Sequence, residues 1–309
     1  MILAAGLSPA WQQILVFDQL RIGEVNRALE VHSCASGKVL NVAIAAHRLS
    51  KESSVEVISV LGGDSGEKIQ SEFHSLGIPI TMIQSPASTR VCTTLLDWKT
   101  RTTTELVENS SPLSANVWEE YLEAFHRLSS FAKIVVFTGS LPDGGPVDFL
   151  HRLQAGSDAR WLLDIRGNEL LSLLPVKPWL VKPNREELAA TFQRDLNSEE
   201  RLHASMREVI ELGAESVLTT RGSSPALLAY RDEFWEFSPP EIQSVNPIGC
   251  GDSLAAGIAV AAQGGKDLIE AVRFGIAAAA HNAELLLPAR LARQRVDELV
   301  PGVKVTRLA

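Results

Sequence analysis

The 309-residue sequence contains only three cysteines, Cys34, Cys92 and Cys250, which share no Cys-x-x-Cys or Cys/His spacing. An odd number without such spacing argues against a disulfide framework or a zinc site and is typical of a reducing cytoplasm. Long apolar runs are also lacking. The longest, residues 276–287, is interrupted by polar residues such as Asn282 and Glu284. It is too short and too polar to span a bilayer, so no membrane segment is expected.

The sequence has no excess of basic residues. Lys and Arg total 29 against 37 for Asp and Glu, which gives a net charge of −8. This balance provides no general attraction to nucleic acid or anionic membranes, so any anionic ligand must be held by a few placed cations. Residues 1–6 lack the basic start of a signal peptide and predict a buried first strand. We therefore expect a cytoplasmic protein.

Short apolar runs alternate with helical patterns along most of the chain. The runs predict strands at 55–61, 133–137, 160–164, 180–182 and 216–219, and the helical patterns cover 39–49, 65–76, 116–129 and 198–212. Such alternation indicates a single α/β domain over 1–309, with a mostly parallel central sheet between two layers of helices. Ligands bind such sheets beyond the carboxyl ends of the strands.

Two segments break this alternation. Residues 14–33 and 90–107 each contain two β-like runs and predict two antiparallel pairs. Together they would form a small sheet built from about 10–35 and 86–107, which acts as a lid, a dimer contact or both. Exposure of its apolar residues, Ile14, Val16, Leu29 and Val91, would favour a homodimer through two lids. The chain from Gly249 onward is expected to be almost wholly helical.

Residues 246–253, N-P-I-G-C-G-D-S, precede an apolar helical run at 254–262. Gly249 and Gly251 allow close approach of the backbone to a ligand, and the amides at a helix N-terminus attract an anion. Asp252 lies in the first turn of this helix, where a carboxylate can accept a proton from a hydroxyl. The alternative is a tight turn with Asp or Ser as the helix N-cap.

This segment resembles the C-terminal signature of the PfkB, or ribokinase-like, carbohydrate kinases, N-T-x-G-A-G-D-S. Four further matches follow the order of the family: S-G-K-V-L-N-V-A at 36–43, G-S-L-P-D-G at 139–144, K-P-N-R-E-E-L at 182–188 and T-R-G at 220–222. The resemblance implies a ribokinase-like three-layer α/β/α fold with a small β-sheet lid, an ATP-dependent kinase activity and Mg²⁺ as cofactor.

Within the family, the chain looks most like the branch of 1-phosphofructokinase, tagatose-6-phosphate kinase and the minor 6-phosphofructokinase. The matching features are G-E-V-N-R at 23–27, the Thr89-Arg90 pair and L-D-I-R-G at 163–167. This likeness implies transfer of a phosphoryl group from ATP to a hydroxyl of a ketohexose monophosphate, which gives a bisphosphate.

The resemblance implies roles for residues of the helix-start motif. Asp252 would be the catalytic base, and Gly249, Cys250 and Gly251 would supply backbone N–H groups that stabilise the transferred phosphoryl group. Cys250 stands where alanine is usual, and we interpret it as a small filler that leaves open a sensitivity to thiol reagents.

A second group of residues is assigned to the nucleotide and the metal. Asn184 and Glu187 would orient Mg²⁺ through water, although the same i, i+3 spacing is that of a capping box. Lys182 would bridge the ATP phosphates, and Thr220 and Gly222 would lie at the nucleotide. Asn282 would border the adenine pocket.

The sugar phosphate would be bound by Gly37, Lys38 and Asn41, with Arg90 closing over it from the lid. Without the motifs, Lys38 and Arg90 would be taken as surface charges. The chain departs from the family pattern at several sites. Gln12 replaces an Asp that anchors sugar hydroxyls, Ser36 and Val39 replace glycines and Pro247 replaces a threonine. Val39 is expected to crowd a phosphate.

These departures cluster on the sugar side, so we expect retained ATP chemistry and an altered sugar preference. A kinase for an unphosphorylated sugar or a nucleoside is a second reading of the sequence. A third is a sugar-phosphate- or nucleotide-binding protein with little turnover.

Overall fold

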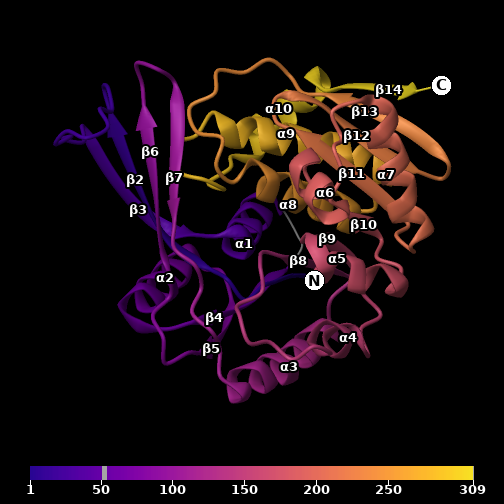
Figure 1. Cartoon of the computed structure of the whole chain (residues 1–309), viewed down its shortest axis with the longest axis horizontal. Coiled ribbons are helices and arrows are strands. Elements are labelled where there is room, and N and C mark those ends of the chain that lie inside the picture. The colour runs from indigo at the N-terminus through magenta and orange to yellow at the C-terminus, as the bar shows by residue number, and fades with distance from the viewer. Residues whose placement is uncertain (51–53, 309) are drawn as a thin grey trace.

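The computed structural model describes residues 1–50 and 54–308, so the expected single domain over 1–309 includes a few residues outside the description. The described residues form a ten-stranded sheet in the order β14-β13-β12-β11-β10-β9-β8-β1-β4-β5 (Figure 1). The strands are β1 (Ile2–Ala5), β4 (Val55–Leu61), β5 (Ile80–Gln84), β8 (Ile134–Thr138), β9 (Arg160–Asp164), β10 (Leu180–Val181), β11 (Ser216–Arg221), β12 (Ser224–Tyr230), β13 (Glu233–Ser238) and β14 (Lys304–Leu308). All pairs from β5 to β11 are parallel, as predicted. The central strands β1, β8 and β9 are apolar runs buried on both faces, as is typical of parallel sheets.

Helices cover both faces of this sheet, which confirms the predicted three-layer α/β/α architecture. One face is packed by α1 (Lys38–Leu49), α2 (Gly63–Leu76), α8 (Cys250–Gln263), α9 (Leu268–Ala283) and α10 (Arg293–Leu299). The other is packed by α3 (Ala115–Ser129), α4 (Phe149–Gln154), α5 (Gly167–Leu173), α6 (Arg185–Phe192) and α7 (Glu199–Glu211). The helical elements of the described residues also include two 3₁₀ turns, η1 (Leu174–Val176) and η2 (Val300–Gly302).

Helices α8 and α9 pack closely because a glycine lies on each helix at the contact. A Cβ atom on Gly257 would lie 2.8 Å from Cα of Gly275, a distance that side chains do not tolerate. This contact fixes α8, whose N-terminus points toward the carboxyl ends of the central strands.

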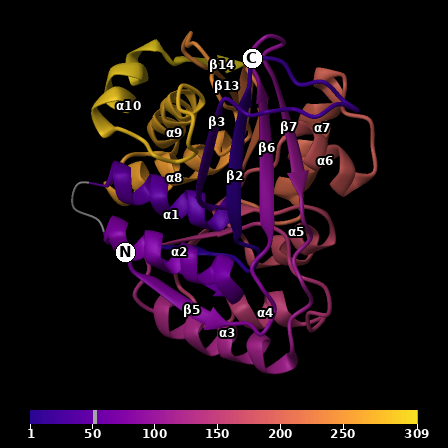
Figure 2. The same cartoon turned by 90° about the vertical axis from the view of Figure 1, so that its left-hand side faces the viewer.

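A second, four-stranded sheet has the order β3-β2-β6-β7 and lies at one side of the molecule (Figure 2). It consists of β2 (Ala10–Phe17), β3 (Glu30–Ser36), β6 (Val91–Asp97) and β7 (Thr102–Val107). The pairs β2–β3 and β6–β7 are antiparallel, as predicted, and β2 joins them by pairing in parallel with β6. We call this unit the small sheet.

The small sheet corrects one expectation about exposure. Ile14 and Val16 are fully buried and form a cluster with Leu96, against which Leu286 and Leu287 pack. Their apolar character is therefore explained by contact with the body of the same chain. The exposed apolar side chains of the small sheet and its loops are Ile22, Val25, Leu29, Val31, Trp98, Leu106 and Val107.

The chain from Gly249 onward is mostly helical, as predicted, with α8, α9 and α10, but three strands near the C-terminus were not predicted. Residues 224–238 form a hairpin, β12–β13, and β14 then pairs with β13 as an edge strand of the main sheet. The hairpin turns at Arg231 and Asp232, both with positive φ, 52° and 63°. This pair lacks the Asn-Gly or Asp-Gly signature of such turns, so no hairpin was predicted at this position.

The order of the strands defines where a ligand site is expected. β1 lies between β4 and β8, so the sheet grows in opposite directions from this point. The crevice beyond the carboxyl ends of β1, β8 and β9 is the usual place for ligands in such sheets. Over residues 1–50 and 54–308, no helix is both long enough and apolar enough to cross a membrane.

Candidate active site

A cavity of about 1180 Å³ lies at the carboxyl ends of the main-sheet strands and extends to the small sheet. Its walls come from β2, β6 and β7 on one side, from the starts of α1, α6 and α8 in the middle, and from β11, β12 and α9 on the other. This volume is large enough for two small ligands side by side. Most of the site residues expected from the sequence line it: Gln12, Gly37, Lys38, Asn41, Arg90, Lys182, Asn184, Glu187, Thr220, Gly222, Gly249, Cys250, Gly251 and Asp252.

Asp252 occupies the first turn of α8 in the centre of this cavity and is only 7% exposed. Asn41 Nδ2 donates a hydrogen bond of 2.8 Å to Asp252 Oδ2, and Ser36 Oγ donates to Asn41 Oδ1 at 3.2 Å. Burial and the nearby carboxylate of Asp164 raise the pKa of Asp252 to about 6, against the opposing effects of Lys38, Asn41 and Lys182. A carboxylate with this pKa is ionised at neutral pH and basic enough to accept a proton.

Gly249 is the N-cap of α8 and adopts a left-handed conformation with φ 82°. A Cβ atom here would be strained and would lie 2.7 Å from Cβ of Pro288, so the turn requires glycine. The next N–H, that of Cys250, donates to Pro247 O at 3.3 Å. Within the described chain, the N–H groups of Gly251 and Asp252 have no acceptor, as expected for the first turn of a helix. They are the amides available to an anion.

Asn282 does not line the cavity as the adenine assignment requires. It is fully buried on α9, where Oδ1 accepts hydrogen bonds from Ser253 Oγ at 3.0 Å and Ala289 N at 2.7 Å. Its Nδ2 donates to Ile248 O at 2.7 Å and contacts Cys250 Sγ at 3.4 Å. Asn282 therefore holds the turn before α8 in place.

Cys250 contacts the same asparagine. Burial raises the pKa of its thiol to about 11, so the thiolate that reacts with electrophiles is scarce at neutral pH. This agrees with a filler role.

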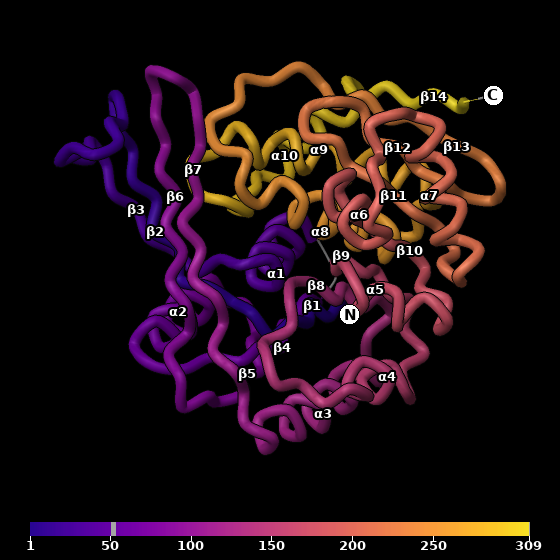
Figure 3. Tube along the Cα trace, viewed as in Figure 1, coloured from indigo at the N-terminus to yellow at the C-terminus, as the bar shows by residue number. Residues whose placement is uncertain are grey.

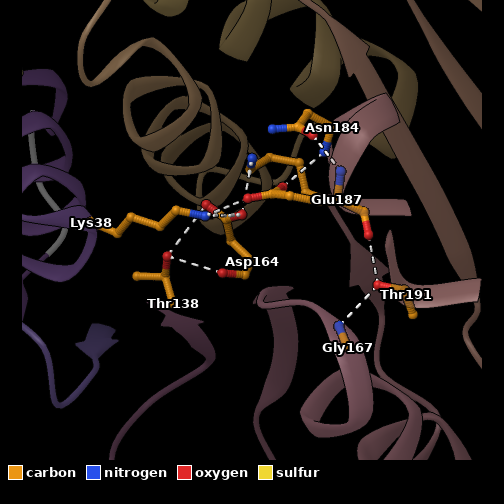
Figure 4. A network of polar contacts seen from close by, with 8 residues as sticks. Lys38, Thr138, Asp164, Gly167, Asn184, Glu187 and Thr191 are labelled. Atoms are coloured by element: carbon orange, nitrogen blue, oxygen red, sulfur yellow. Dashed lines mark hydrogen bonds and ion pairs between the residues drawn. The ribbon is translucent and has the colours of Figure 1, made fainter. Parts of the chain in front are cut away.

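Four charged side chains form a network in the wall of the same cavity as Asp252: Lys38, Asp164, Lys182 and Glu187. Figure 4 shows Lys38, Asp164 and Glu187 of this network. Lys38 Nζ lies 3.1 Å from both Asp164 Oδ1 and Glu187 Oε1, and Lys182 Nζ lies 3.3 Å from Asp164 Oδ1. Thr138 Oγ1 donates to Asp164 Oδ2 at 3.3 Å. The network joins α1, β9, the residue after β10 and α6, so it forms only when the main sheet is assembled.

The ion pairs of the network shift the pKa values of Lys38 and Asp164. Burial alone would lower the pKa of Lys38, but the carboxylates of Asp164, Glu187 and Asp252 outweigh it and raise that pKa. Burial would raise the pKa of Asp164, and the ammonium groups of Lys182 and Lys38 instead hold it below its ordinary value. Lys38 and Asp164 are therefore both charged at neutral pH.

Asp164 is a site residue that the sequence analysis did not assign. It ends β9, lines the cavity and is 1% exposed. The signal was present, because a carboxylate directly after a buried apolar run lies at the carboxyl edge of a parallel sheet. The segment L-D-I-R-G was used only to compare the chain with a family branch.

Asn184 and Glu187 form a capping box, which was the alternative to metal binding for their i, i+3 spacing. Asn184 Oδ1 accepts from the N–H of Glu187 at 2.7 Å, and Glu187 Oε2 accepts from the N–H of Asn184 at 2.9 Å. The capping role does not prevent contact with a ligand, because both residues also line the cavity. In the described part of the chain, no group of three or more His, Cys, Asp or Glu side chains is arranged to hold a metal ion.

On the small-sheet side, Gln12 is 3% exposed and its Nε2 donates to Thr94 Oγ1 at 2.7 Å. Gly37 has a φ of 88°, and a Cβ atom there would lie 2.9 Å from the backbone N of Ala10. Val39 does not crowd the cavity as expected. Its side chain is buried in the core, where it would contact any Cβ placed on Gly6.

The guanidinium of Arg90 is not free to bind a phosphate with all its donors, because it already donates hydrogen bonds to three backbone carbonyls. Its Nε donates to Pro9 O at 3.2 Å, one terminal nitrogen to Ser8 O at 3.0 Å and the other to Glu108 O at 3.1 Å. The guanidinium thus braces the points where β2 and β6 leave the main body. Of its five N–H groups, two are left for a ligand.

The opposite end of the cavity is more apolar. Ala226, Ile242, Ile276 and Ala279 lie there, and Thr220 and Gly222 border it at the end of β11. Arg221, between them, is held by Pro225 O at 2.6 Å and by Glu199 and Glu236. An apolar slot next to small polar residues suits a planar base attached to phosphates.

Solved structures with the same architecture include several sugar kinases. Phosphofructokinase-2 from Escherichia coli in complex with substrates and products shares 24% identity, covers 97% of this chain and 98% of its own, and superposes with a TM-score of 0.88. A possible 1-phosphofructokinase from Thermotoga maritima shares 18% identity over 100% of both chains, also with a TM-score of 0.88. Ribokinase from Arabidopsis thaliana complexed with ribose and ATP shares 22% identity over 97% of this chain and 98% of its own, with a TM-score of 0.74.

The fold is thus ribokinase-like, as the sequence motifs implied. The family model described as pfkB family carbohydrate kinase matches residues 12–285, and the chain belongs to this family. It is an ATP-dependent carbohydrate kinase.

Proposed function

We propose that the enzyme transfers the γ-phosphoryl group of ATP to a hydroxyl of a ketohexose monophosphate and releases a ketohexose bisphosphate and ADP. The observation that carries the proposal is the position of Asp252. It lies at the N-terminus of α8, is held by Asn41 at 2.8 Å and has its pKa raised to about 6. A proton acceptor and an anion-binding helix end at one point are what phosphoryl transfer to an alcohol needs.

In this proposal Asp252 accepts the proton of the sugar hydroxyl while the hydroxyl oxygen forms a bond to the γ-phosphorus. The bond from that phosphorus to the bridging oxygen of ATP breaks, and ADP leaves with the electron pair. The free N–H groups of Gly251 and Asp252 and the ammonium of Lys182 stabilise the transferred group. A Cβ atom on Gly251 would lie 3.4 Å from Lys182 Nζ, so amides and cation converge.

The residues present fit a Mg²⁺ ion. Asp164 and Glu187 offer carboxylate oxygens at the cavity wall, and Asn184 lies beside them. Mg²⁺ is commonly held by one or two carboxylates together with water and nucleotide phosphates, so a larger protein cluster is not needed. When bound, the ion neutralises phosphate charge. Thr220 and Gly222 would then border the nucleotide.

The sugar phosphate is placed at the small-sheet end. Gly37 allows close backbone approach, and Lys38, Asn41 and the two remaining N–H groups of Arg90 supply donors. The amide of Gln12, in place of a carboxylate, would select a different hydroxyl pattern. The solved E. coli phosphofructokinase-2 in complex with fructose-6-phosphate, 24% identical, makes fructose 6-phosphate a sensible first candidate.

One observation favours a second candidate, a kinase for an unphosphorylated sugar. Arg90 donates to three backbone carbonyls and Lys38 is paired with two carboxylates, so both candidate phosphate ligands already have partners. A neutral sugar would require neither of them to rearrange.

The test is coupled ADP release with ATP and Mg²⁺ across fructose 1-phosphate, fructose 6-phosphate, tagatose 6-phosphate and the unphosphorylated sugars. Asp252→Asn removes the base, and Asp267→Asn is the matched control because Asp267 is the exposed N-cap of α9. Turnover confined to a phosphosugar and lost only in Asp252→Asn supports the proposal. Turnover confined to free sugars identifies the second candidate. Tight sugar-phosphate binding without ADP release would contradict both and leave a binding protein.

We also propose that the small sheet acts as a lid and pairs with its copy in a homodimer. Leu29, Val31, Leu106 and Val107 are each more than half exposed, and they lie on its two edge strands or just before them. Substitution Val31→Lys should shift the protein from dimer to monomer in light scattering, and Val147→Lys, at a more exposed site outside the small sheet, should not.

A further inference from the structure

The segment that follows α9 contacts the small sheet. Leu286 and Leu287 pack against the buried cluster of Ile14, Val16 and Leu96, so this segment covers the inner face of the small sheet. Figure 3 shows the trace after α9 passing close to that sheet. We call residues 286–290 the strap.

The strap also contacts the turn that carries Asp252, residues 246–252, here called the catalytic turn. Asn246 Nδ2 donates to Leu286 O at 2.9 Å, and Pro288 fills the space beside Gly249. The N–H of Ala289 donates at 2.7 Å to Asn282 Oδ1, whose own amide holds Ile248 O. Leu286 and Pro288 of the strap thus contact the catalytic turn directly, and Ala289 holds it through Asn282.

Arg290 ties the end of the strap to the base of the small sheet. One terminal nitrogen donates to Ala35 O at 3.2 Å and pairs with Glu72, and Glu72 Oε2 accepts from the N–H of Ala35 at 2.6 Å. Both polar groups of the Ala35 backbone are therefore held by this ion pair. Ala35 lies two residues before Gly37, the start of the sugar-side wall.

The middle of the strap is tightly packed and conformationally constrained. Pro288 and Ala289 are buried, and Ala289 is held with a positive φ of 64°, a conformation that alanine adopts only when its surroundings impose it. A constrained segment that contacts two elements at once moves both together.

We propose that the strap transmits the position of the small sheet to the catalytic turn, and that Leu287 and Arg290 are positioning residues for phosphoryl transfer. A shift of the small sheet displaces Leu286 and Leu287 and is passed through Pro288 and Ala289 to Gly249 and Asn282. Reactions of this kind lose rate steeply when reacting groups are misplaced by about 1 Å. The inference rests on the proposed role of Asp252 as base.

The test combines kinetics with hydrogen exchange. Leu287→Ala removes packing on the small sheet without touching the catalytic turn, and Arg290→Gln breaks the ion pair with Glu72. Their matched controls are Leu171→Ala, a half-buried leucine on the other face of the main sheet, and Arg293→Gln, which pairs with Asp297 and donates to Leu49 O. Exchange is followed in peptides covering 245–253, with those of α3 as an internal reference.

Both strap variants should lower kcat about tenfold or more. They should also speed exchange in 245–253 severalfold, with α3 unchanged, while the controls leave both readouts near wild type. Leu287→Met, which keeps the side-chain volume, should restore them. Unchanged exchange in 245–253 in both strap variants would overturn the inference, as would an equal effect of the controls. An active Asp252→Asn enzyme would instead refute the proposed base and leave the exchange result standing.

Discussion

Asn41 on α1 and Asp252 on α8 are 211 residues apart in the sequence, yet Asn41 Nδ2 donates a 2.8 Å hydrogen bond to Asp252 Oδ2. The bond favours the ionised carboxylate, which cannot itself donate, and so opposes the effect of burial. It also leaves Oδ1 of Asp252 for a substrate hydroxyl. The sugar-side wall and the proposed base are therefore linked by one short contact.

The pKa of Asp252 predicts how activity depends on pH. Because burial raises this pKa to about 6 and only the carboxylate accepts a proton, kcat/KM should rise with pH up to about 6 and level off above it. At pH 5 it should be about a tenth of the plateau. Asn41→Ala should move this acid limb to higher pH, since the lost hydrogen bond favoured ionisation. A limb near the ordinary aspartate pKa in the wild type would contradict the assignment.

Asp252→Asn should lower the activity of the enzyme and raise its stability. The pKa of Asp252 is higher in the folded state than in the unfolded state, so the stability of the fold falls as pH rises between these two pKa values. Above about pH 6, Asp252 is ionised in both states and destabilises the fold. The variant should lose about a hundredfold or more in kcat. Its free energy of unfolding at pH 8 should exceed that of the wild type by on the order of 1–3 kcal/mol. Urea unfolding at pH 8 and pH 4 measures this, and the gain should disappear at pH 4.

Much of the fold could be predicted because its main-sheet strands are short, continuous apolar runs. The predicted strands 55–61 and 160–164 match β4 and β9 residue for residue. The strands β13 and β14 were missed because partly exposed strands carry a weaker apolar signal. The hairpin that joins β12 to β13 was missed because its turn lacks the usual Asn-Gly or Asp-Gly pair. Their pairing depends on contacts between distant segments.

The residues that line the candidate site could be predicted from the sequence, but most of the contacts between them could not. The motif residues converge on one cavity, but partners of long side chains depend on packing that no motif encodes. Arg90 donates to the carbonyls of Ser8 and Pro9, about 80 positions earlier, and Asn282 turns away from the cavity toward Ile248. The burial of Ile14 could not be predicted for the same reason, because Ile14 is covered by Leu286 and Leu287 of the strap.

The two lysines of the network should differ in their contribution to stability. Lys182 is 4% exposed and Lys38 37%, so water screens the second more than the first. Lys182→Met should lower the free energy of unfolding by about 3–5 kcal/mol, because it removes a buried partner of Asp164. Lys38→Met should cost at most about 1 kcal/mol after solvent screening. Urea unfolding at pH 7 compares them, and an equal or reversed order would show that burial does not govern the network.

Gln12→Asp should change the sugar preference and leave the nucleotide untouched. Aspartate cannot donate to Thr94 Oγ1 and presents an acceptor to substrate hydroxyls instead. The ratio of kcat/KM between two ketohexose phosphates should change about tenfold or more. KM for ATP should stay within about twofold. Gln13→Asp, on the exposed face of the same strand, is the control, and an equal effect there would indicate a general electrostatic cause.

Gly249→Ala tests whether the catalytic turn tolerates any side chain. The substitution places a Cβ atom 2.7 Å from Cβ of Pro288 and forces alanine to a φ of 82°. The left-handed backbone alone costs about 1–2 kcal/mol, and the contact must displace either the turn or the strap. Gly265→Ala is a matched control, because Gly265 has a similar φ of 87° and no atom within 4 Å of its added Cβ.

Both alanine variants should therefore lose similar stability from backbone strain, while only Gly249→Ala should lose activity as well. We expect its kcat to fall about a hundredfold, since a shift of the turn moves both Asp252 and the free amides of the first helical turn. Thermal unfolding and ADP release measured on the same preparations separate the two effects. A Gly249→Ala enzyme with wild-type kcat would mean that the geometry of this turn is not limiting for phosphoryl transfer, and that Pro288 yields without moving Asp252.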